Sequence, residues 1–289
     1  MKKNVDIEEI TYSINSKGVR IFLTVMLLCA GLLLIMPFVW MTVVSFERYA
    51  NINPPFPPSL KIKNFSLFNF KIVTESGAML KAYTNSITVA VIGVIANTIS
   101  VLMGGYAFSK GNFKGKKLIF LVILATMMLP FETRMIPMYK LFLKLGLVNT
   151  FIPLILPNII DAFGILLAKN FFDKLPDCLS EAAAIDGAGP FRTFIKVFAP
   201  LTKPIVATIV ILKFMDNWNS FLWPLVILTG FEKRTVPILI SSFSYEGGTR
   251  MAGSTMTVAF LGIIPVLIVF LLLQKYIIQS IALSGVKGE

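Results

Sequence analysis

Four polar residues recur at helical spacing inside an apolar stretch: Lys213, Asp216, Asn217 and Ser220. Residues three and four apart share one helix face, so these side chains form a single polar stripe. In a hydrocarbon environment a charge is costly unless it is paired or hydrated. The stripe should therefore face the interior of a helix bundle, either as a structural pair of Lys213 with Asp216 or Asn217, or as the lining of a polar path.

The same stretch carries aromatic and amide groups that could bind many kinds of polar solute. Trp218 and Trp223 offer broad apolar faces for stacking, and Asn217 and Asn219 can exchange hydrogen bonds with hydroxyl groups. Tryptophan near a membrane boundary is also a common interfacial anchor, and this alternative stays open.

Other polar residues follow prolines. Glu132 and Arg134 come after Pro130, and Asn158 and Asp161 come after a second proline. Such positions fit broken helices around a hydrated cavity, and equally the outer ends of helices that meet water. We expect Glu132 and Arg134 to lie at outer helix ends that meet water. Asp161 lies deeper in its apolar run, and it can have a structural role or line the path.

The composition argues against an enzyme, a metal protein and a nucleic-acid-binding protein. The 289 residues include no His, and no nucleophile stands beside a base. Cys29 and Cys178 lack metal-ligand spacing and an obvious pairing. The net charge of +12 is scattered between apolar runs and forms no basic stripe. A Gly-x-x-x-x-Gly-Lys-Ser/Thr phosphate loop is absent, so the chain does not bind ATP by that route.

The apolar runs predict an all-α membrane protein with about six transmembrane helices. The chain is 56% hydrophobic and only 15% charged, and a helix needs about 20 mostly apolar residues to cross a bilayer. The expected spans cover residues 20–45, 83–108, 117–138, 150–170, 203–229 and 253–280. The first run is long enough to be a retained transmembrane helix and not a cleaved signal peptide.

The distribution of Lys and Arg between short loops favours both termini on the cytoplasmic side. We therefore divide the chain into a cytoplasmic N-terminal segment (1–19), a transmembrane domain (20–280) and a cytoplasmic tail (281–289). The longest inner loop covers residues 169–203, and Pro-rich sequence assigns residues 46–82 to an outer loop.

The inner loop predicts two short helices separated by glycines. Pro176-Asp177 can start the first helix, Gly187 can end it, and Pro190 suits the first turn of the second. Small residues on one face of the first helix leave room for a close partner. On spacing alone, an ordinary amphipathic connector is the favoured interpretation.

Glu181-Ala182-Ala183, Gly187 and Val197-Phe198-Ala199-Pro200 resemble the EAA loop of ABC importer permeases. Val197 and Ala199 depart from the family's isoleucine and leucine. Further segments are similar to carbohydrate-type permeases, and to the smaller membrane subunit of maltose-type importers. They are Gly105-Tyr106-Ala107-Phe108, Ile136-Pro137-Met138-Tyr139, Leu145-Gly146-Leu147, Leu154-Ile155-Leu156-Pro157, Trp218-Asn219-Ser220-Phe221-Leu222-Trp223-Pro224-Leu225 and Ser284-Gly285-Val286-Lys287-Gly288.

The resemblance implies the type I ABC importer permease fold and a non-enzymatic subunit that moves a sugar, preferably an oligosaccharide, into the cytoplasm. The first inner-loop helix would be a coupling helix that docks on a separate ATPase. Its docking residues would be Glu181, Ala182, Ala183, Ile185, Asp186 and Gly187. The residues expected to line the path or bind the solute are Asn158, Asp161, Lys213, Asn217, Trp218, Asn219, Ser220 and Trp223.

The implied partners are a second, larger permease, an ATPase dimer that binds ATP and Mg²⁺, and an extracytoplasmic sugar-binding protein. This chain itself would hold no cofactor and would lie in a bacterial or archaeal cytoplasmic membrane. The outer loops 46–82 and 230–252 would meet the binding protein. Residues 245–248 form a polar tip suited to that contact, or an ordinary solvated turn.

Two alternatives come from other functional classes. An ion-gradient-driven transporter or channel usually has inverted repeats and intramembrane acids for ion coupling, whereas acids are few here and no repeat is visible. A membrane-embedded enzyme would need a nucleophile and a base, which the sequence does not offer.

Overall fold

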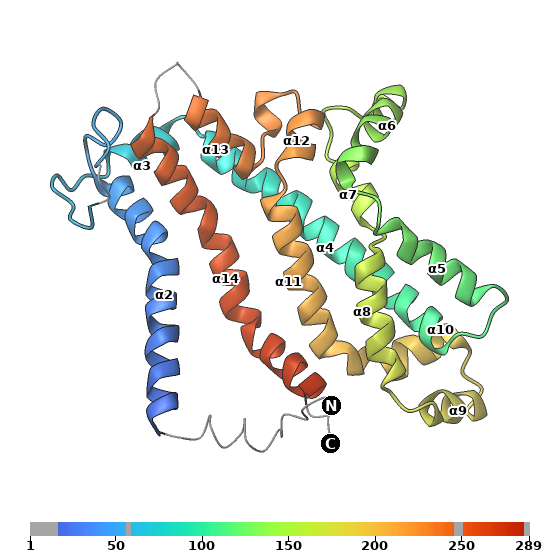
Figure 1. The fold of residues 1–289 in the computed structure, drawn as a ribbon. Helices are drawn as coiled ribbons and strands as arrows, with labels where there is room; N and C mark the ends of the chain where they lie inside the picture. Colours follow the sequence, from blue (N-terminus) through green and yellow to red (C-terminus); the bar gives the residue numbers. More distant parts are fainter. Residues whose placement is uncertain (1–16, 56–58, 246–250, 286–289) are drawn as a thin grey trace, which may run out of the picture.

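A computed structural model describes residues 17–55, 59–245 and 251–285 (Figure 1). The described chain is predominantly helical, with an isolated antiparallel bridge between Glu47 and Phe65. The α-helices are α2 (Lys17–Phe46), α3 (Phe68–Glu75), α4 (Ala78–Lys110), α5 (Lys116–Thr126), α6 (Phe131–Lys144), α7 (Ile152–Ile155), α8 (Ala162–Asp173), α9 (Cys178–Ile185), α10 (Pro190–Thr193), α11 (Lys203–Asn219), α12 (Leu222–Ile227), α13 (Val236–Tyr245) and α14 (Ala252–Gly285). Tighter or wider turns are the 3-10 turns η1 (Leu156–Asn158), η3 (Ala199–Thr202) and η4 (Phe231–Lys233) and the π turn η2 (Phe194–Phe198).

The prediction of about six spans is confirmed. Within the described residues, five helical stretches are long and apolar enough to cross a membrane, and α5 with α6 gives a sixth if that bent pair counts as one span. The spans follow the hydrophobic runs because a helix satisfies its backbone groups internally, which the bilayer requires.

The expected third span, residues 117–138, is wrong as a single helix. α5 ends at Thr126, α6 begins at Phe131, and the two are bent by 96°. Pro130 has no N–H to donate and disfavours helical backbone in the residue before it, so a break at this point is physically reasonable. The bend turns α6 away from the axis of α5 (Figure 1).

The other predicted boundaries also shift. The expected span 203–229 breaks after Asn219, where Ser220 is extended, and resumes as the short helix α12. The expected outer loops contain helices, α3 in the first and α13 in the second. In the inner loop both predicted short helices form, but the second continues through η2 and η3 into α11 without a separate loop.

The described ends and the inner loop lie on one side of the molecule. The beginning of α2, the end of α14 and helix α9 are at the bottom of Figure 1, whereas α3, α12 and α13 are at the top. This arrangement agrees with the predicted topology, in which the N-terminal end, the C-terminal end and the 169–203 region share the cytoplasmic side.

Helix α4 forms the centre of the bundle, because it packs on α8, α11 and α13. Its contact with α8 depends on a missing side chain: a Cβ on Gly105 would lie 2.4 Å from the Cβ of Ala168. Next to this contact the aromatic residues Phe172, Phe198 and Tyr106 pack together at the inner end of the bundle.

Helix α2 stands apart from the core except where it meets α14 (Figure 1). Directly after α2, the carboxylate of buried Glu47 accepts hydrogen bonds from the backbone amides of Lys63 (2.8 Å) and Asn64 (3.1 Å). Burial alone would raise the pKa of Glu47, but these amide bonds outweigh it and hold the pKa below its ordinary value. The Glu47 carboxylate thereby fixes the outer loop against the end of α2.

Candidate functional site: a polar cavity and an exposed inner helix

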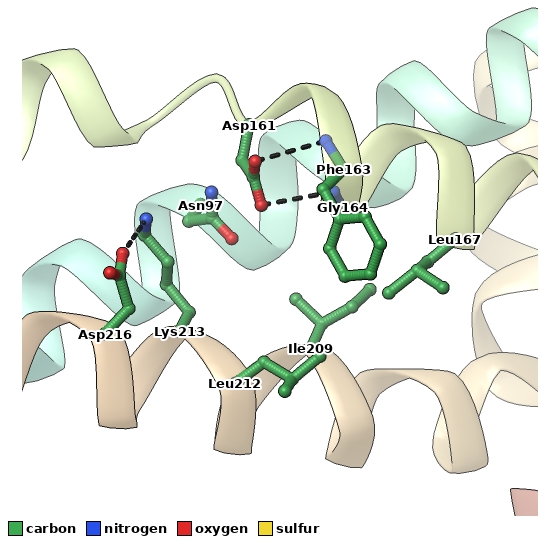
Figure 2. A pocket seen from close by; sticks show the side chains of 9 residues that line it. All are labelled: Asn97, Asp161, Phe163, Gly164, Leu167, Ile209, Leu212, Lys213 and Asp216. Carbon is green, nitrogen blue, oxygen red and sulfur yellow. Dashed lines mark hydrogen bonds and ion pairs between the residues drawn. The ribbon is translucent and has the colours of Figure 1, made fainter. Parts of the chain in front are cut away.

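A cavity of about 270 Å³ lies between α4, α8 and α11 (Figure 2). Its walls combine apolar side chains with a small number of polar groups, as solute-binding sites usually do. The lining residues are Asn97, Asp161, Phe163, Gly164, Leu167, Ile209, Leu212, Lys213 and Asp216. Three of the polar residues come from three different helices, so the site exists only when the bundle is assembled.

The polar stripe of α11 contributes an ion pair to this cavity. Lys213 Nζ lies 2.7 Å from Asp216 Oδ2 and 3.5 Å from Asn158 Oδ1. The lysine is buried, whereas the Asp216 side chain is 63% exposed. The structure thus shows the structural pair, in which Asp216 neutralises Lys213, and it also places the Asp216 carboxylate at the cavity wall, whereas a role of this cavity as the solute path stays a prediction.

Asp161 likewise has two roles, as a helix cap and as part of the cavity wall. Its carboxylate oxygens accept hydrogen bonds from the backbone amides of Phe163 (3.2 Å) and Gly164 (3.1 Å), which makes it the N-cap of α8. Figure 2 shows the same side chain at the wall of the cavity. The cap explains why an aspartate is placed at the break before α8.

A second cavity of about 290 Å³ shares Asp216 with the first. Of the predicted path residues, Asn158, Asn217, Ser220 and Trp223 line it, together with Phe131, Glu132, Phe221 and Leu222. Asn217 Nδ2 is buried and has no hydrogen-bond partner among the described residues. Such an unpaired donor is costly unless a solute or water accepts its hydrogen bond.

Trp218 and Trp223, the two tryptophans expected to line the path, are both buried in the protein. Trp218 donates a 3.0 Å hydrogen bond to the carbonyl of Gly262 and stacks on Phe214, and it is absent from the walls of both cavities. The structure therefore gives no support to its expected place in the path, which stays a prediction. Trp223 does line the second cavity, but its Nε1 donates to the Pro153 carbonyl (2.8 Å), so little of the ring is free for stacking.

Asn219 is exposed and lies outside the walls of both cavities. Glu132 is exposed in the first turn of α6, as its sequence context favoured, and it also lines the second cavity. The 96° bend accounts for this, because it places the first turn of α6 beside α11 and α12.

Asn97 and Ser100 on α4 are functional candidates that the sequence reasoning missed. The buried Asn97 side chain donates to the carbonyls of Asn158 (2.9 Å) and Ile159 (3.3 Å), and the Ser100 hydroxyl also bonds the Ile159 carbonyl. These bonds satisfy backbone carbonyls at the break between η1 and α8, which otherwise would lie unpaired in the membrane. Their signal in the sequence is a pair of polar residues three apart in an apolar run.

The inner helix α9 begins and ends where the prolines and glycines predict. Gly187 has a φ of +73°, and the amides of Gly187 and Ala188 donate to the carbonyls of Ala184 (3.0 Å) and Ala183 (2.9 Å). This is a Schellman motif, which needs a residue in the left-handed region and therefore favours glycine. The sharp exit expected at Gly187 is confirmed.

The outer face of α9 is open. Glu181, Ala182 and Asp186 are exposed, Ala183 is buried against the protein, and Ile185 exposes 87% of its surface at the helix end. Beside α9 lies a hollow of about 310 Å³ that also has the basic residues Arg192 and Lys196 in its wall. This open face leaves room for a partner protein, but docking itself stays a prediction.

Comparisons with known proteins agree with this geometry. Residues 96–283 match the family described as binding-protein-dependent transport system inner membrane component. The chain is 35% identical to an arabinooligosaccharides transport system permease protein of Halalkalibacterium halodurans, over 80% of this chain and 81% of that protein. It is 32% identical to a trehalose/maltose transport system permease protein of Thermococcus litoralis, over 93% of this chain and 98% of that protein.

A solved structure has a similar fold. One chain of a bacterial ABC transporter involved in the import of the acidic polysaccharide alginate superimposes with a TM-score of 0.80 at 25% identity. The match covers 91% of this chain and 98% of that chain.

Proposed function

The chain belongs to the family of binding-protein-dependent transport system inner membrane components, and from this premise we propose that it carries an oligosaccharide across the membrane as one subunit of an ATP-driven importer. It is a multi-pass protein of the cytoplasmic membrane, and its family is a class of transport proteins and not of enzymes. The observation that best supports the proposal is the pair of cavities that meet at Asp216 inside the spans.

The chemistry of these cavities suits a polar, uncharged solute. Asn158, Asn217 and Ser220 offer amides and a hydroxyl, and Phe131 and Phe221 offer apolar surface. Sugar rings present both hydroxyl groups and apolar faces, so this mixture can bind them without a fixed charge partner. The names of the relatives refer to arabinooligosaccharides, lactose, and trehalose or maltose, which supports an oligosaccharide.

The inner helix α9 would dock on a separate ATPase dimer that binds ATP and Mg²⁺. Ile185 would enter an apolar depression, and Glu181 and Asp186 would pair with basic groups of the ATPase. Closure of that dimer would move α9 and the attached helices, and thereby open the cavities alternately to the two sides. The remaining partners would be a larger permease and an extracytoplasmic sugar-binding protein that meets the outer loops.

Part of the outer contact predicted for residues 245–248 lies outside the described residues, which resume at Met251. An ion-gradient-driven carrier was the alternative from the sequence. The family and relatives give it no support.

The proposal is tested by purifying the intact complex in mild detergent, identifying the partners by mass spectrometry, and reconstituting it in liposomes. Uptake of labelled arabino-oligosaccharides, maltose, trehalose and lactose is then measured with and without ATP. We expect ATP-dependent uptake of at least one of these sugars, and recovery of an ATPase and a second permease. Recovery of no ATPase, or uptake driven by an ion gradient alone, would overturn the proposal.

A further inference from the structure

The inner end of α4 is bonded to the segment that leads into α9. Lys110 is the last residue of α4, and its side chain is only 7% exposed. Its Nζ donates to the Leu175 carbonyl (2.6 Å) and pairs with Asp177 Oδ1 (2.6 Å). One buried ammonium group thus joins the end of α4 to the two residues on either side of Pro176.

Asp177 directly precedes α9, where an aspartate normally caps its own helix. Its side chain makes no capping hydrogen bond here, and it is 79% exposed apart from the contact with Lys110. A second bond supports the same junction, because the Ser109 hydroxyl donates to Asp173 Oδ1 (2.7 Å) at the end of α8. The connection from α8 to α9 is therefore held from both sides by the last two residues of α4.

These bonds are not needed to complete α4 itself. Lys116 Nζ already donates to the carbonyls of Ser109 (2.9 Å) and Gly111 (2.8 Å) at the end of α4. Free carbonyl groups at a helix C-terminus are usually satisfied by such a neighbour. Lys110 instead directs its donors away from α4, toward the segment that carries α9.

Along its length the same unbroken helix touches the cavity and the outer side. Asn97 bonds the backbone at the break before α8, and Gly93 lies against Asn217, since a Cβ on Gly93 would be 2.6 Å from Asn217 Nδ2. At its outer end Lys81 pairs with Glu232 of η4, and Asn85 donates to two carbonyls of that segment. A displacement of the inner end of α4 therefore also reaches the cavity in the middle of the bundle and the contacts at its outer end.

We propose that Lys110 is a positioning residue that transmits the movement of α9 to α4, and through α4 to the cavities. This inference rests on the proposed function, because it supposes that an ATPase moves α9. A lysine that is buried, ion-paired and bonded to a backbone carbonyl permits little relative motion between the groups it joins. Without it, α9 would still dock and move, but α4 would follow it less closely.

The variants are Lys110→Met, Lys110→Arg and Asp177→Asn, with Lys114→Met as the matched control. Met keeps the length and apolar stem of the lysine but removes its charge and its hydrogen-bond donors. Arg keeps the charge and the donors. Lys114 is an exposed lysine in the turn after α4 and lies outside the contacts described for the junction. Asp177→Asn leaves the buried lysine in place and changes an exposed side chain, so it keeps the proposal testable if Lys110→Met does not fold.

In the reconstituted complex we expect Lys110→Met to lower the sugar transported per ATP about tenfold, because α4 loses its charge-assisted hydrogen bonds to Leu175 and Asp177 and follows α9 less closely. Basal ATP hydrolysis and recovery of the ATPase should be unchanged. Asp177→Asn should give a smaller loss, Lys110→Arg should restore most of the ratio, and Lys114→Met should match the wild type. Wild-type ratios in both Lys110→Met and Asp177→Asn would overturn the inference.

A second measurement needs no knowledge of the sugar. With Cys29→Ser, spin labels on the native Cys178 of α9 and on a Leu80→Cys change at the exposed start of α4 report the distance between the two helices. In the wild-type background we expect a narrow distribution that stays the same in the nucleotide-free and ATP-vanadate states. With Lys110→Met it should broaden and shift on trapping.

An unchanged distribution in Lys110→Met, or a wild-type distance that already shifts, would contradict the transmission through Lys110. Failure of the proposed function has a different signature: the wild-type complex would neither trap ATP with vanadate nor take up any sugar. The width of the distance distribution in the nucleotide-free chain would still report whether Lys110 holds the two helices together.

Discussion

At the residue scale, most polar side chains within the spans have identifiable partners. Lys213 pairs with Asp216, Asn97 bonds the backbone at the break before α8, and Asp161 caps α8. Two buried amide atoms at the cavity walls have no partner among the described residues: Nδ2 of Asn217 in the second cavity and Oδ1 of Asn97 in the first. Asn217 and Asn97 are therefore the strongest candidates for a solute contact.

Removal of the cap at Asp161 gives a stability prediction. Asp161→Ala should lower the free energy of unfolding by about 1 kcal/mol, because two amides of α8 lose their acceptor. Asp161→Asn keeps a capping oxygen and is the matched control. The measurement is the thermal unfolding midpoint in detergent. If both variants unfold at the same lowered temperature, the charge and not the cap stabilises α8.

Gly187 tests the exit from α9. Its φ of +73° strains any side chain, most of all a β-branched one, although no atom would contact an added Cβ. Gly187→Val should leave membrane insertion intact but lower the sugar transported per ATP severalfold. Gly189 also has free space but an extended backbone, so Gly189→Val is the control. Equal ratios in the two variants would show that the shape of the exit does not matter.

At the element scale, the breaks in the helices determine where the cavities lie. The bundle contains prolines that leave a helix continuous, Pro37 in α2, Pro137 in α6 and Pro265 in α14. Pro130, by contrast, lies at the 96° bend between α5 and α6. At that bend the amides of Met127, Met128 and Leu129 find acceptors three residues back, so the chain turns without leaving them unpaired. Proline permits a break, but the surrounding contacts decide whether it occurs.

The α4–α8 contact gives a prediction for two adjacent glycines. A Cβ on Gly105 would lie 2.8 Å from the backbone nitrogen of Lys169, whereas a Cβ on Gly104 would meet only the Ile165 side chain at 3.3 Å. Gly105→Ala should therefore destabilise the protein by about 1–3 kcal/mol through overpacking. Gly104→Ala should be nearly neutral, because the gain in helix propensity offsets the mild contact. The comparison uses unfolding midpoints in one detergent, and a reversed order would contradict this packing.

At the scale of the whole molecule, the chain exposes far more apolar surface than a soluble monomer can. Leu33 and Leu34 on α2 are mostly exposed, and the apolar window of this helix has no buried residue within the chain. Lipid and other subunits must cover this surface. None of the three buried clusters in the described part of the chain contains a residue of α2, so α2 adds little to the core.

The native cysteines test the orientation of the whole chain. Cys178 is exposed on α9, which we place in the cytoplasm, and Cys29 lies within the span of α2. A membrane-impermeant maleimide should label Cys178 in inside-out vesicles and not in right-side-out ones. Cys29 should stay unlabelled in both, and a Cys178→Ser variant gives the background. Labelling of Cys178 from the outside would reverse the assigned topology.

The sequence by itself determined the spans, the limits of α9 and the polar stripe of α11. These features depend on local properties: the hydropathy of a segment, and the caps and backbone preferences of prolines and glycines within one helical turn. Only the tertiary structure decided the 96° bend, the burial of Trp218, the part played by Asn97 and Glu132 in the cavity walls, and the bond from Lys110 to Asp177. Asp161 and Asp177 show the reason. Each directly precedes a helix, where an aspartate is expected as the N-cap, yet one caps its own helix and the other pairs with a lysine 67 residues away, because partners so distant in the chain are set by how the helices pack.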